Sequence, residues 1–410
     1  MLRNYFLIAI AVLKRRKFFT FISLFGIGFT LTILMLLTAF VSRIVGDDYP
    51  NKKKDRALYI NSVVQTGARH GSMNGGRPSF YFLEHYTQGL KTPVKVAISS
   101  SYSTTKTYVN GKKLSIDYKY TNADYWDALD YKFLEGRPYT RREIDNGDRV
   151  AVISEDLKNA YFGDVPSVLG KYVEADDVQY RVTGVVRNIP VTTYMFYADL
   201  YLPYTVSKSD LRDKSYNGSY MGVLLAPSAS DVPKMKAEFD EVIRRVPIDT
   251  SNYDHLDCPA ESYFAAYVND NSARMSGVTI VTMVIGVFVF LLMLLPTLNL
   301  ININVTRIME RSSEIGIRKA FGASSRTLVY QFLVENIILT LLGGVIGVVL
   351  SFIGIQIFNA YQPIPNFYLS MNFAVLLLGF LACLVFGLVS GVYPAWRMSR
   401  LHVIDALKVS

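Results

Sequence analysis

The side chains best suited to hold a metal ion lie in one polar stretch of the chain. Asp254, His255, Asp257 and Cys258 fall within residues 254–258, and carboxylates, imidazoles and thiolates are the usual ligands of zinc. A zinc site normally draws its ligands from two separate pairs, and the sequence has no second pair at that spacing. We therefore interpret the stretch as a solvated acidic loop and expect no metal site.

Sequence signatures of nucleotide binding and hydrolysis do not occur in these 410 residues. Gly170-Lys171 is the nearest approach to the phosphate-binding pattern G-x-x-x-x-G-K-[ST], but it has no glycine at the upstream position and no Ser or Thr after the lysine. The hydrolase patterns H-E-x-x-H and G-x-S-x-G do not occur either. We expect no catalytic residue and no cofactor site in this chain.

One carboxylate and two amides lie inside long apolar segments. Glu335 is the only charged residue between Thr327 and Phe358, and a carboxylate in hydrocarbon is costly enough to be a functional candidate by default. A position near the lipid headgroups stays open, because Glu335 follows Arg326 by only nine residues. Asn299 and Asn302 lie near the end of another apolar segment, where amides can hydrogen-bond neighbouring helices.

Four apolar segments are long enough to cross a bilayer, which requires about 20 residues of helix. Hydrophobic residues make up 50% of the chain and charged residues 19%, so the apolar clustering indicates a membrane protein. We predict an α-helical membrane protein with four transmembrane helices, at residues 18–45, 275–304, 327–358 and 372–395. Residues 1–17 are predicted to form an interfacial helix, with a short core helix packed on its neighbours as the alternative, and no cleavable signal peptide is expected.

The charge distribution orients these helices and excludes nucleic-acid binding. Residues 47–274 carry 29 Lys and Arg against 30 Asp and Glu, whereas the rest of the chain carries 14 against 4. The excess positive charge therefore lies beside the apolar segments, where cytoplasmic loops carry it, and no basic face remains for DNA or RNA. We predict cytoplasmic termini, a cytoplasmic loop at 305–326, a cytoplasmic tail at 396–410, an external domain at 46–274 and a short external loop at 359–371.

The external domain shows mixed α+β patterning. Asn110-Gly111 between two strand-like runs predicts a hairpin, because these residues suit the positive φ angles of a type I′ turn. Ser154 and Gly163 are suited to begin and end a short helix, and apolar residues at helical spacing predict an amphipathic helix over 231–246. Other strand-like runs are Leu58–Val64, Val150–Ile153, Tyr180–Val186 and Met221–Leu225.

Small residues recur every four positions in two of the predicted spans. Such spacing places them on one helix face, where they let helix backbones approach closely. We interpret these ladders as packing surfaces within one subunit, in preference to a dimer seam. Their members are Gly343 and Gly347, and then Gly379, Cys383, Gly387 and Gly391.

The cytoplasmic loop between the second and third spans combines charges with apolar residues. A loop that only fixes topology does not need apolar side chains, whereas a loop that docks on another protein does. The residues concerned are Glu310, Arg311, Glu314, Ile315, Gly316, Ile317, Arg318, Lys319, Ala320, Phe321, Gly322 and Ala323.

Residues 314–323 of this loop, Glu-Ile-Gly-Ile-Arg-Lys-Ala-Phe-Gly-Ala, resemble the signature of the MacB/FtsX permease family of ABC transporters. The resemblance continues at 331–335, at 342–344 and near the C-terminus at 391–397 and 405–408. It departs at Val403, where the family often has proline. Weaker blocks in the external domain follow in the same order as in the family's periplasmic domain, at 133–137, 150–153, 161–163, 170–171 and 180–185.

This resemblance implies a permease subunit in a bacterial inner membrane that works with a separate cytoplasmic ATPase, which binds ATP and Mg. A second permease copy or a paralogue would complete a dimer, and residues 310–323 would form the coupling element seated in the ATPase. A periplasmic adaptor and an outer-membrane channel are further candidate partners. In the family, ATP-driven closure moves the membrane helices and, through them, the periplasmic domains.

Several functions remain open on the sequence alone. Within the resemblance they are efflux from the periplasm, release of lipoproteins, and FtsX-type regulation of a periplasmic cell-wall enzyme. The external segment of 228 residues is large for the cell-division regulators, which favours transport. A membrane sensor belongs to a different class, but the cytoplasmic segments are too short for a signalling output domain.

Overall fold

The computed structural model describes residues 15, 17–46, 49–67, 71–109, 111–269, 276–310, 325–374, 376–381, 384–385 and 388. The chain divides into two compact units. The helical unit comprises residues up to Arg43, residues 282–363 and residues from 368 onward. The α+β unit comprises residues 44–281 together with residues 364–367.

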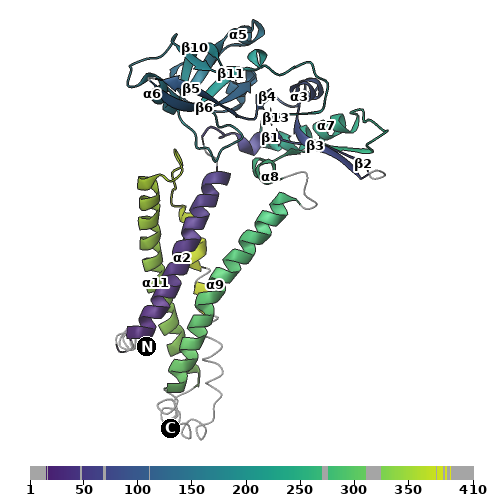
Figure 1. Cartoon of the computed structure of the whole chain (residues 1–410). Coiled ribbons are helices and arrows are strands. Elements are labelled where there is room, and N and C mark those ends of the chain that lie inside the picture. Colours follow the sequence, from purple (N-terminus) through teal and green to yellow (C-terminus); the bar gives the residue numbers. More distant parts are fainter. Residues whose placement is uncertain are drawn as a thin grey trace. The chain divides into compact units, whose positions relative to one another are not determined.

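Three long helices dominate the described part of the helical unit (Figure 1). They are α2 (Lys17–Val45), α9 (Gly277–Glu310) and α11 (Ser325–Tyr361). Among the described residues, two stretches are long and apolar enough to cross a membrane, Thr20–Ile44 and Leu333–Tyr361, and a shorter apolar stretch covers Gly277–Leu292. In the predicted fourth span, helix is described at 373–374, 376–381, 384–385 and 388, so the count of four transmembrane helices stays a prediction.

An aromatic face of α2 is left uncovered within the described chain. Phe18, Phe21, Phe25 and Phe29 are each at least half exposed, and their spacing of three or four residues places them on one side of the helix. Rings of Phe21, Phe25 and Phe29 stack in sequence, with centroids 6.1 and 5.6 Å apart. Large exposed apolar side chains along one helix face are expected where lipid is the solvent.

The α+β unit contains fifteen described strands. Their bounds are β1 Ala57–Ile60, β2 Val63–Gly67, β3 Ser72–Pro78, β4 Lys95–Ser100, β5 Ser103–Val109, β6 Lys112–Thr121, β7 Phe133–Gly136, β8 Val150–Ser154, β9 Tyr172–Ala175, β10 Val178–Val186, β11 Leu200–Pro203, β12 Asn217–Gly218, β13 Tyr220–Leu225, β14 His255–Asp257 and β15 Ala260–Glu261. An eleven-stranded sheet has the order β15-β1-β13-β4-β6-β11-β8-β10-β7, with β5 added on β6 and β9 on β10. A four-stranded sheet has the order β12-β3-β2-β14.

Short helices cover these sheets. They are α3 (Phe80–Thr87), α4 (Asp124–Ala128), α5 (Arg141–Asp145), α6 (Glu155–Phe162), α7 (Val232–Arg244) and α8 (Tyr263–Val268), with 3₁₀ turns η1 (Lys54–Arg56), η2 (Tyr204–Val206) and η3 (Ala229–Asp231). One apolar core cluster lies beneath α3 and α7 and includes Phe82, Met235 and Phe239. Two further clusters include Trp126 and Leu157, respectively. These clusters hold the helices on the sheet by burying their apolar faces.

Several local predictions are confirmed. Strands β5 and β6 form the hairpin, with Val109 opposite Lys112 and Gly111 at φ +75°. Helix α6 begins after Ser154, whose hydroxyl accepts from the Leu157 N–H, and it ends at Gly163, which has φ +73°. Helix α7 buries Met235, Phe239 and Ile243 on one side.

The prediction of a single strand over Leu58–Val64 is wrong. The chain leaves the large sheet after Ile60 and enters the four-stranded sheet at Val63, so two strands replace one. The run is apolar on both sides of the break because each strand is buried in its own sheet. An apolar run therefore shows no alternation that could reveal the change of sheet.

Residues 364–367 follow α11 in the chain but belong to the α+β unit. The Asn366 amide donates to the Asp156 carboxylate at 2.7 Å, and the Asn188 amide donates to the other oxygen of Asp156 at 2.8 Å. The next residue in the chain, Phe367, is buried. The short connection after α11 is thus held by side-chain hydrogen bonds at the start of α6.

Candidate functional site

The first candidate site is the interface between α2 and α11 in the helical unit, which is built on glycines. Gly343 and Gly347 are one turn apart on α11 and face Ile27, Gly28 and Leu31 of α2. A Cβ atom at Gly343 would lie 2.8 Å from the Ile27 Cβ, and one at Gly347 would lie 2.7 Å from the Leu31 Cβ and 2.9 Å from the Gly28 carbonyl oxygen. No side chain fits at these distances, so the close approach depends on glycine.

Hydroxyl groups satisfy part of the backbone along the same interface. Thr32 Oγ1 donates to the Gly28 carbonyl at 2.8 Å and lies 3.3 Å from the Gly347 carbonyl of α11. Ser351 Oγ donates to the Gly347 carbonyl at 2.6 Å. Where backbones come this close in an apolar medium, such hydrogen bonds add to van der Waals packing between helices.

Glu335 lies on α11 and is enclosed by protein. Its side chain is 1% exposed, and that of the adjacent Asn336 is 2% exposed. Intramembrane carboxylates usually face the interior of a helix bundle, because contact with lipid would leave the charge unsolvated. The structure places Glu335 in that environment, and a coupling role for it stays a prediction.

The other sequence-predicted residues are distributed as follows. A Cβ atom at Gly379 would lie 3.2 Å from Leu34 Cδ2 of α2, so this small residue also faces α2. Asn299, Asn302 and Glu310 lie within α9. Residues 311–323 of the predicted coupling loop, as well as Cys383, Gly387 and Gly391, fall outside the described residues. The coupling loop therefore stays a prediction.

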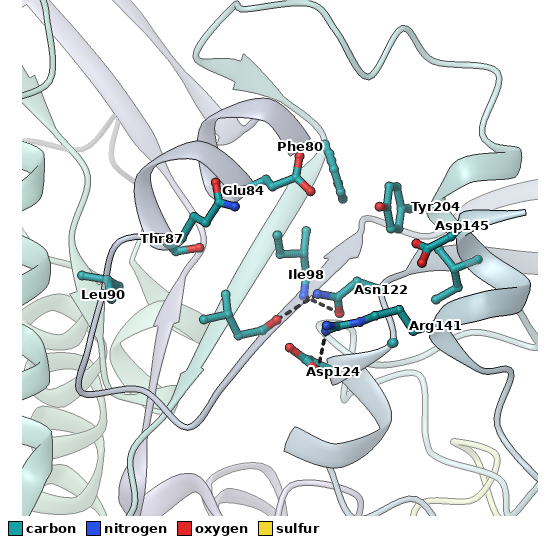
Figure 2. A pocket seen from close by; sticks show the side chains of 14 residues that line it. Phe80, Glu84, Thr87, Leu90, Ile98, Asn122, Asp124, Arg141, Asp145 and Tyr204 are labelled. Carbon is teal, nitrogen blue, oxygen red and sulfur yellow. Dashed lines mark hydrogen bonds and ion pairs between the residues drawn. The ribbon is translucent and has the colours of Figure 1, made fainter. Parts of the chain in front are cut away.

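The second candidate site is a pocket of about 420 Å³ in the α+β unit, which no sequence pattern indicated (Figure 2). Its walls come from α3, β4, the start of α4, α5 and η2. These segments are separated by long stretches of chain. They come together only in the folded unit, where β4 pairs with β6 and residues of α3 and α5 line the same pocket. The volume lies within the range of small-molecule sites in proteins.

Two aromatic rings form one wall of the pocket. Phe80 and Tyr204 stack with centroids 4.2 Å apart and an interplanar angle of 22°. Phe80 is placed by the start of α3, where the Ser79 hydroxyl accepts from the Phe82 N–H at 3.0 Å. Tyr204 begins η2 immediately after β11. The pair offers an aromatic surface beside polar groups.

Charged side chains surround this aromatic wall. Asp124 is shared between Lys95 and Arg141, each with a nitrogen 3.3 Å from the same carboxylate oxygen. Glu84 and Asp145 form no hydrogen bond or ion pair through their carboxylates with the described residues. Burial raises the pKa of Glu84, and the pKa of Tyr204 is raised by burial and then by the charges of Glu84 and Asp145.

The pocket floor is held by Asn122. Its side-chain oxygen accepts from the Ile98 and Tyr125 N–H groups at 3.0 and 3.1 Å, and its amide donates to the Val96 carbonyl at 2.8 Å. The same side chain therefore ties β4, at Val96 and Ile98, to the first turn of α4. The arrangement is suited to noncovalent recognition of a small molecule.

The stretch considered for metal binding forms β14 and the residues around it. His255 and Asp257 are exposed strand positions, whereas Cys258 is buried and burial raises the pKa of its thiol. Among the residues that the structure describes, no three His, Cys, Asp or Glu side chains are grouped to hold a metal ion.

Comparison with known families covers both units. Residues 20–242 match the MacB-like periplasmic core domain, and residues 286–403 match the FtsX-like permease C-terminal domain. An uncharacterized ABC transporter permease, YknZ of Bacillus subtilis, is 26% identical over 330 residues, which cover 80% of this chain and 79% of that protein. The macrolide export ATP-binding/permease protein MacB of Pasteurella multocida is 26% identical over 283 residues, which cover 69% of this chain.

This chain spans only 41% of that MacB protein's length. Among solved structures, the periplasmic region of MacB from Actinobacillus actinomycetemcomitans aligns with a TM-score of 0.35 at 16% identity, covering 56% of this chain and 92% of that one.

Proposed function

Because the chain belongs to the family of permeases that join a MacB-like periplasmic core domain to an FtsX-like C-terminal domain, we propose that it is the membrane subunit of an ABC-type transporter. In this proposal it couples ATP hydrolysis on a separate ATPase chain to movement of its α+β unit. The observation that carries the proposal is that the two family matches, in this order, extend over both units of the chain.

The proposal of a separate ATPase draws on the relative YknZ, which is named as a permease and of which this chain spans 79%. The 410 residues of this chain carry no G-x-x-x-x-G-K-[ST] pattern. We propose that ATP and Mg bind to the partner, and that Glu310 and residues 311–323 contact it.

The connectivity of the two units supports mechanical coupling. α2 ends at Val45, where the α+β unit begins, and α9 begins at Gly277, where that unit ends. The glycines of α11 let its backbone pack closely against α2, and we propose that the two helices move together. A displacement produced at the cytoplasmic loop would thus reach the α+β unit through helices that enter it directly.

We further propose that the chain lies in a bacterial inner membrane with both termini cytoplasmic and the α+β unit in the periplasm. The positive charge beside the apolar segments supports this orientation. A second permease copy or a paralogue would complete the assembly, and efflux with a periplasmic adaptor and an outer-membrane channel is the favoured activity.

The test is co-purification of the chain with its candidate ATPase, followed by ATP hydrolysis in lipid nanodiscs. Glu314→Lys and Gly316→Trp should abolish association and permease-dependent stimulation of the ATPase. A matched charge reversal in the α+β unit, Asp164→Lys, should leave both unchanged. If the loop variants associate with the ATPase and stimulate it as wild type does, the loop is not the coupling element and the proposal fails.

A further inference from the structure

The charges around the pocket of the α+β unit do not cancel. The Lys95 ammonium lies 2.6 Å from Asp127, and the Arg141 guanidinium lies 3.3 Å from Asp124, so each cation has a carboxylate of its own. The remaining lining carboxylates, Glu84 and Asp145, have no cationic partner among the described residues. Both residues are exposed, so two negative charges without a cation of their own lie at the solvent-facing part of the pocket lining.

These two carboxylates lie on either side of the aromatic wall. Figure 2 shows the Glu84 carboxyl beside the Phe80 ring and the Asp145 carboxyl beside the Tyr204 ring. Both residues line the same pocket as Tyr204, whose ring stacks on that of Phe80. An aromatic face attracts cations through its quadrupole, and a carboxylate attracts them by charge, so the two features select the same kind of group.

The rest of the lining favours an apolar body over a bare ion. Val96, Ile98 and Ile144 contribute aliphatic surface, and Ile144 is buried at the end of α5. The side-chain oxygen of Asn122 is already engaged by two backbone N–H groups, and Thr87 donates to the Leu83 carbonyl at 2.7 Å. These polar groups therefore have little capacity to replace the hydration shell of an inorganic cation.

We propose that this pocket is a binding site for a small organic cation, an amine or quaternary ammonium on an apolar body. The positive group lies between Glu84 and Asp145, and the apolar body packs on Phe80 and Tyr204. Binding of this kind does not require the ATPase partner, so the site stands or falls independently of the proposed coupling function.

An anionic ligand is the natural competitor for the site, because Arg141 is also part of the lining. Arg141 is already paired with Asp124, so its charge is compensated, whereas the carboxylates of Glu84 and Asp145 have no such partner in the described part of the chain. An anion would also approach two uncompensated carboxylates. The geometry therefore favours the cation.

The experiment uses the full chain in lipid nanodiscs without ATPase, titrated with benzyltrimethylammonium and followed by isothermal titration calorimetry. Benzyl alcohol and phenylmethanesulfonate serve as neutral and anionic probes of similar shape. The variant is Glu84→Gln with Asp145→Asn, which removes both charges and keeps the shapes. Asp164→Asn, an exposed carboxylate outside the pocket, is the matched control.

We expect saturable binding of the cation and none of the anion, with affinity that falls as salt rises. The double variant should weaken binding roughly 10-fold or more, and the control should bind as wild type. Tyr204→Leu should weaken binding of the cation more than that of benzyl alcohol. Equal binding of cation and anion, unchanged binding in the double variant, or no saturable binding of the cation would each overturn the proposal.

Discussion

Replacing Gly347 by alanine should separate α2 from α11. The added Cβ would lie 2.7 Å from the Leu31 Cβ and 2.9 Å from the Gly28 carbonyl oxygen. Neither of these α2 atoms can rotate away, because the Gly28 carbonyl oxygen belongs to the backbone and the Leu31 Cβ is bonded directly to the backbone. The helices must therefore move apart by about 1 Å to restore ordinary contact distances, which weakens the contact between Thr32 and Gly347.

The magnitude follows from two opposing contributions. Overpacking costs about 1–3 kcal/mol, and alanine improves helix propensity over glycine by about 1 kcal/mol. The expected net loss is about 1 kcal/mol, within a range of about 0–2 kcal/mol. Gly286 on α9 has open space around it, so Gly286→Ala should have no cost. Gly344→Ala should fall between the two, because the three atoms nearest its added Cβ all belong to the ring of Phe380, which can turn.

The assay is unfolding of the purified chain in mixed micelles of mild detergent and SDS, followed by far-UV circular dichroism. The SDS midpoint should fall for Gly347→Ala, fall less for Gly344→Ala and stay level or rise for Gly286→Ala. If Gly347→Ala and Gly286→Ala unfold at the same midpoint, the two helices are not held at the glycine face. Equal losses in both would mean that the effect does not depend on the interface.

Three further predictions concern the pH dependence of stability in the α+β unit, measured as thermal midpoints by fluorescence. Burial, followed by the charge of Asp117, raises the pKa of Asp199 to about 6, so the wild type should lose stability as pH rises from 4 to 7. Asp199→Asn should remove this loss, which is worth up to about 3 kcal/mol. Identical pH profiles of the wild type and the variant would contradict the prediction. The Arg137 guanidinium holds the pKa of Glu143 down at about 2, so Glu143→Gln should cost about 2–3 kcal/mol of stability at neutral pH. This difference between wild type and variant should shrink as pH falls below 4.5. A difference that stays constant with pH would refute the role of the ion pair. Burial lowers the pKa of Lys119, whose side-chain nitrogen donates to the Met195 carbonyl. The stability of the wild type should therefore rise between pH 7 and 10 more than that of Lys119→Met. Parallel profiles of the two proteins would show that Lys119 does not titrate in this range.

The sequence by itself determined the features that depend on residues close together in the chain. Ser154 and Gly163 bound α6 because a capping hydroxyl and a positive φ act within one turn of helix. Gly111 supports the hairpin for the same local reason. Long uncharged runs indicate membrane helices without reference to any partner, because the bilayer interacts with each helix separately.

The glycine spacing on α11 was determined partly by the sequence and partly by the tertiary structure. Spacing alone placed Gly343 and Gly347 on one face of a helix, because periodicity is a property of the helix itself. It did not say which helix they meet. Only the folded structure identified Ile27, Gly28 and Leu31 of α2 as the surface they contact.

Only the tertiary structure decided the sheet order, the break after Ile60 and the pocket. Strand β1 lies between β13 and β15, both more than 150 residues later in the chain, and this pairing arises from long-range burial that no local pattern encodes. The pocket likewise joins Glu84, Asp145 and Tyr204 from three distant segments. Each of these residues is unremarkable in its own segment, because a binding site consists of distances between side chains, and those distances exist only once the chain has packed.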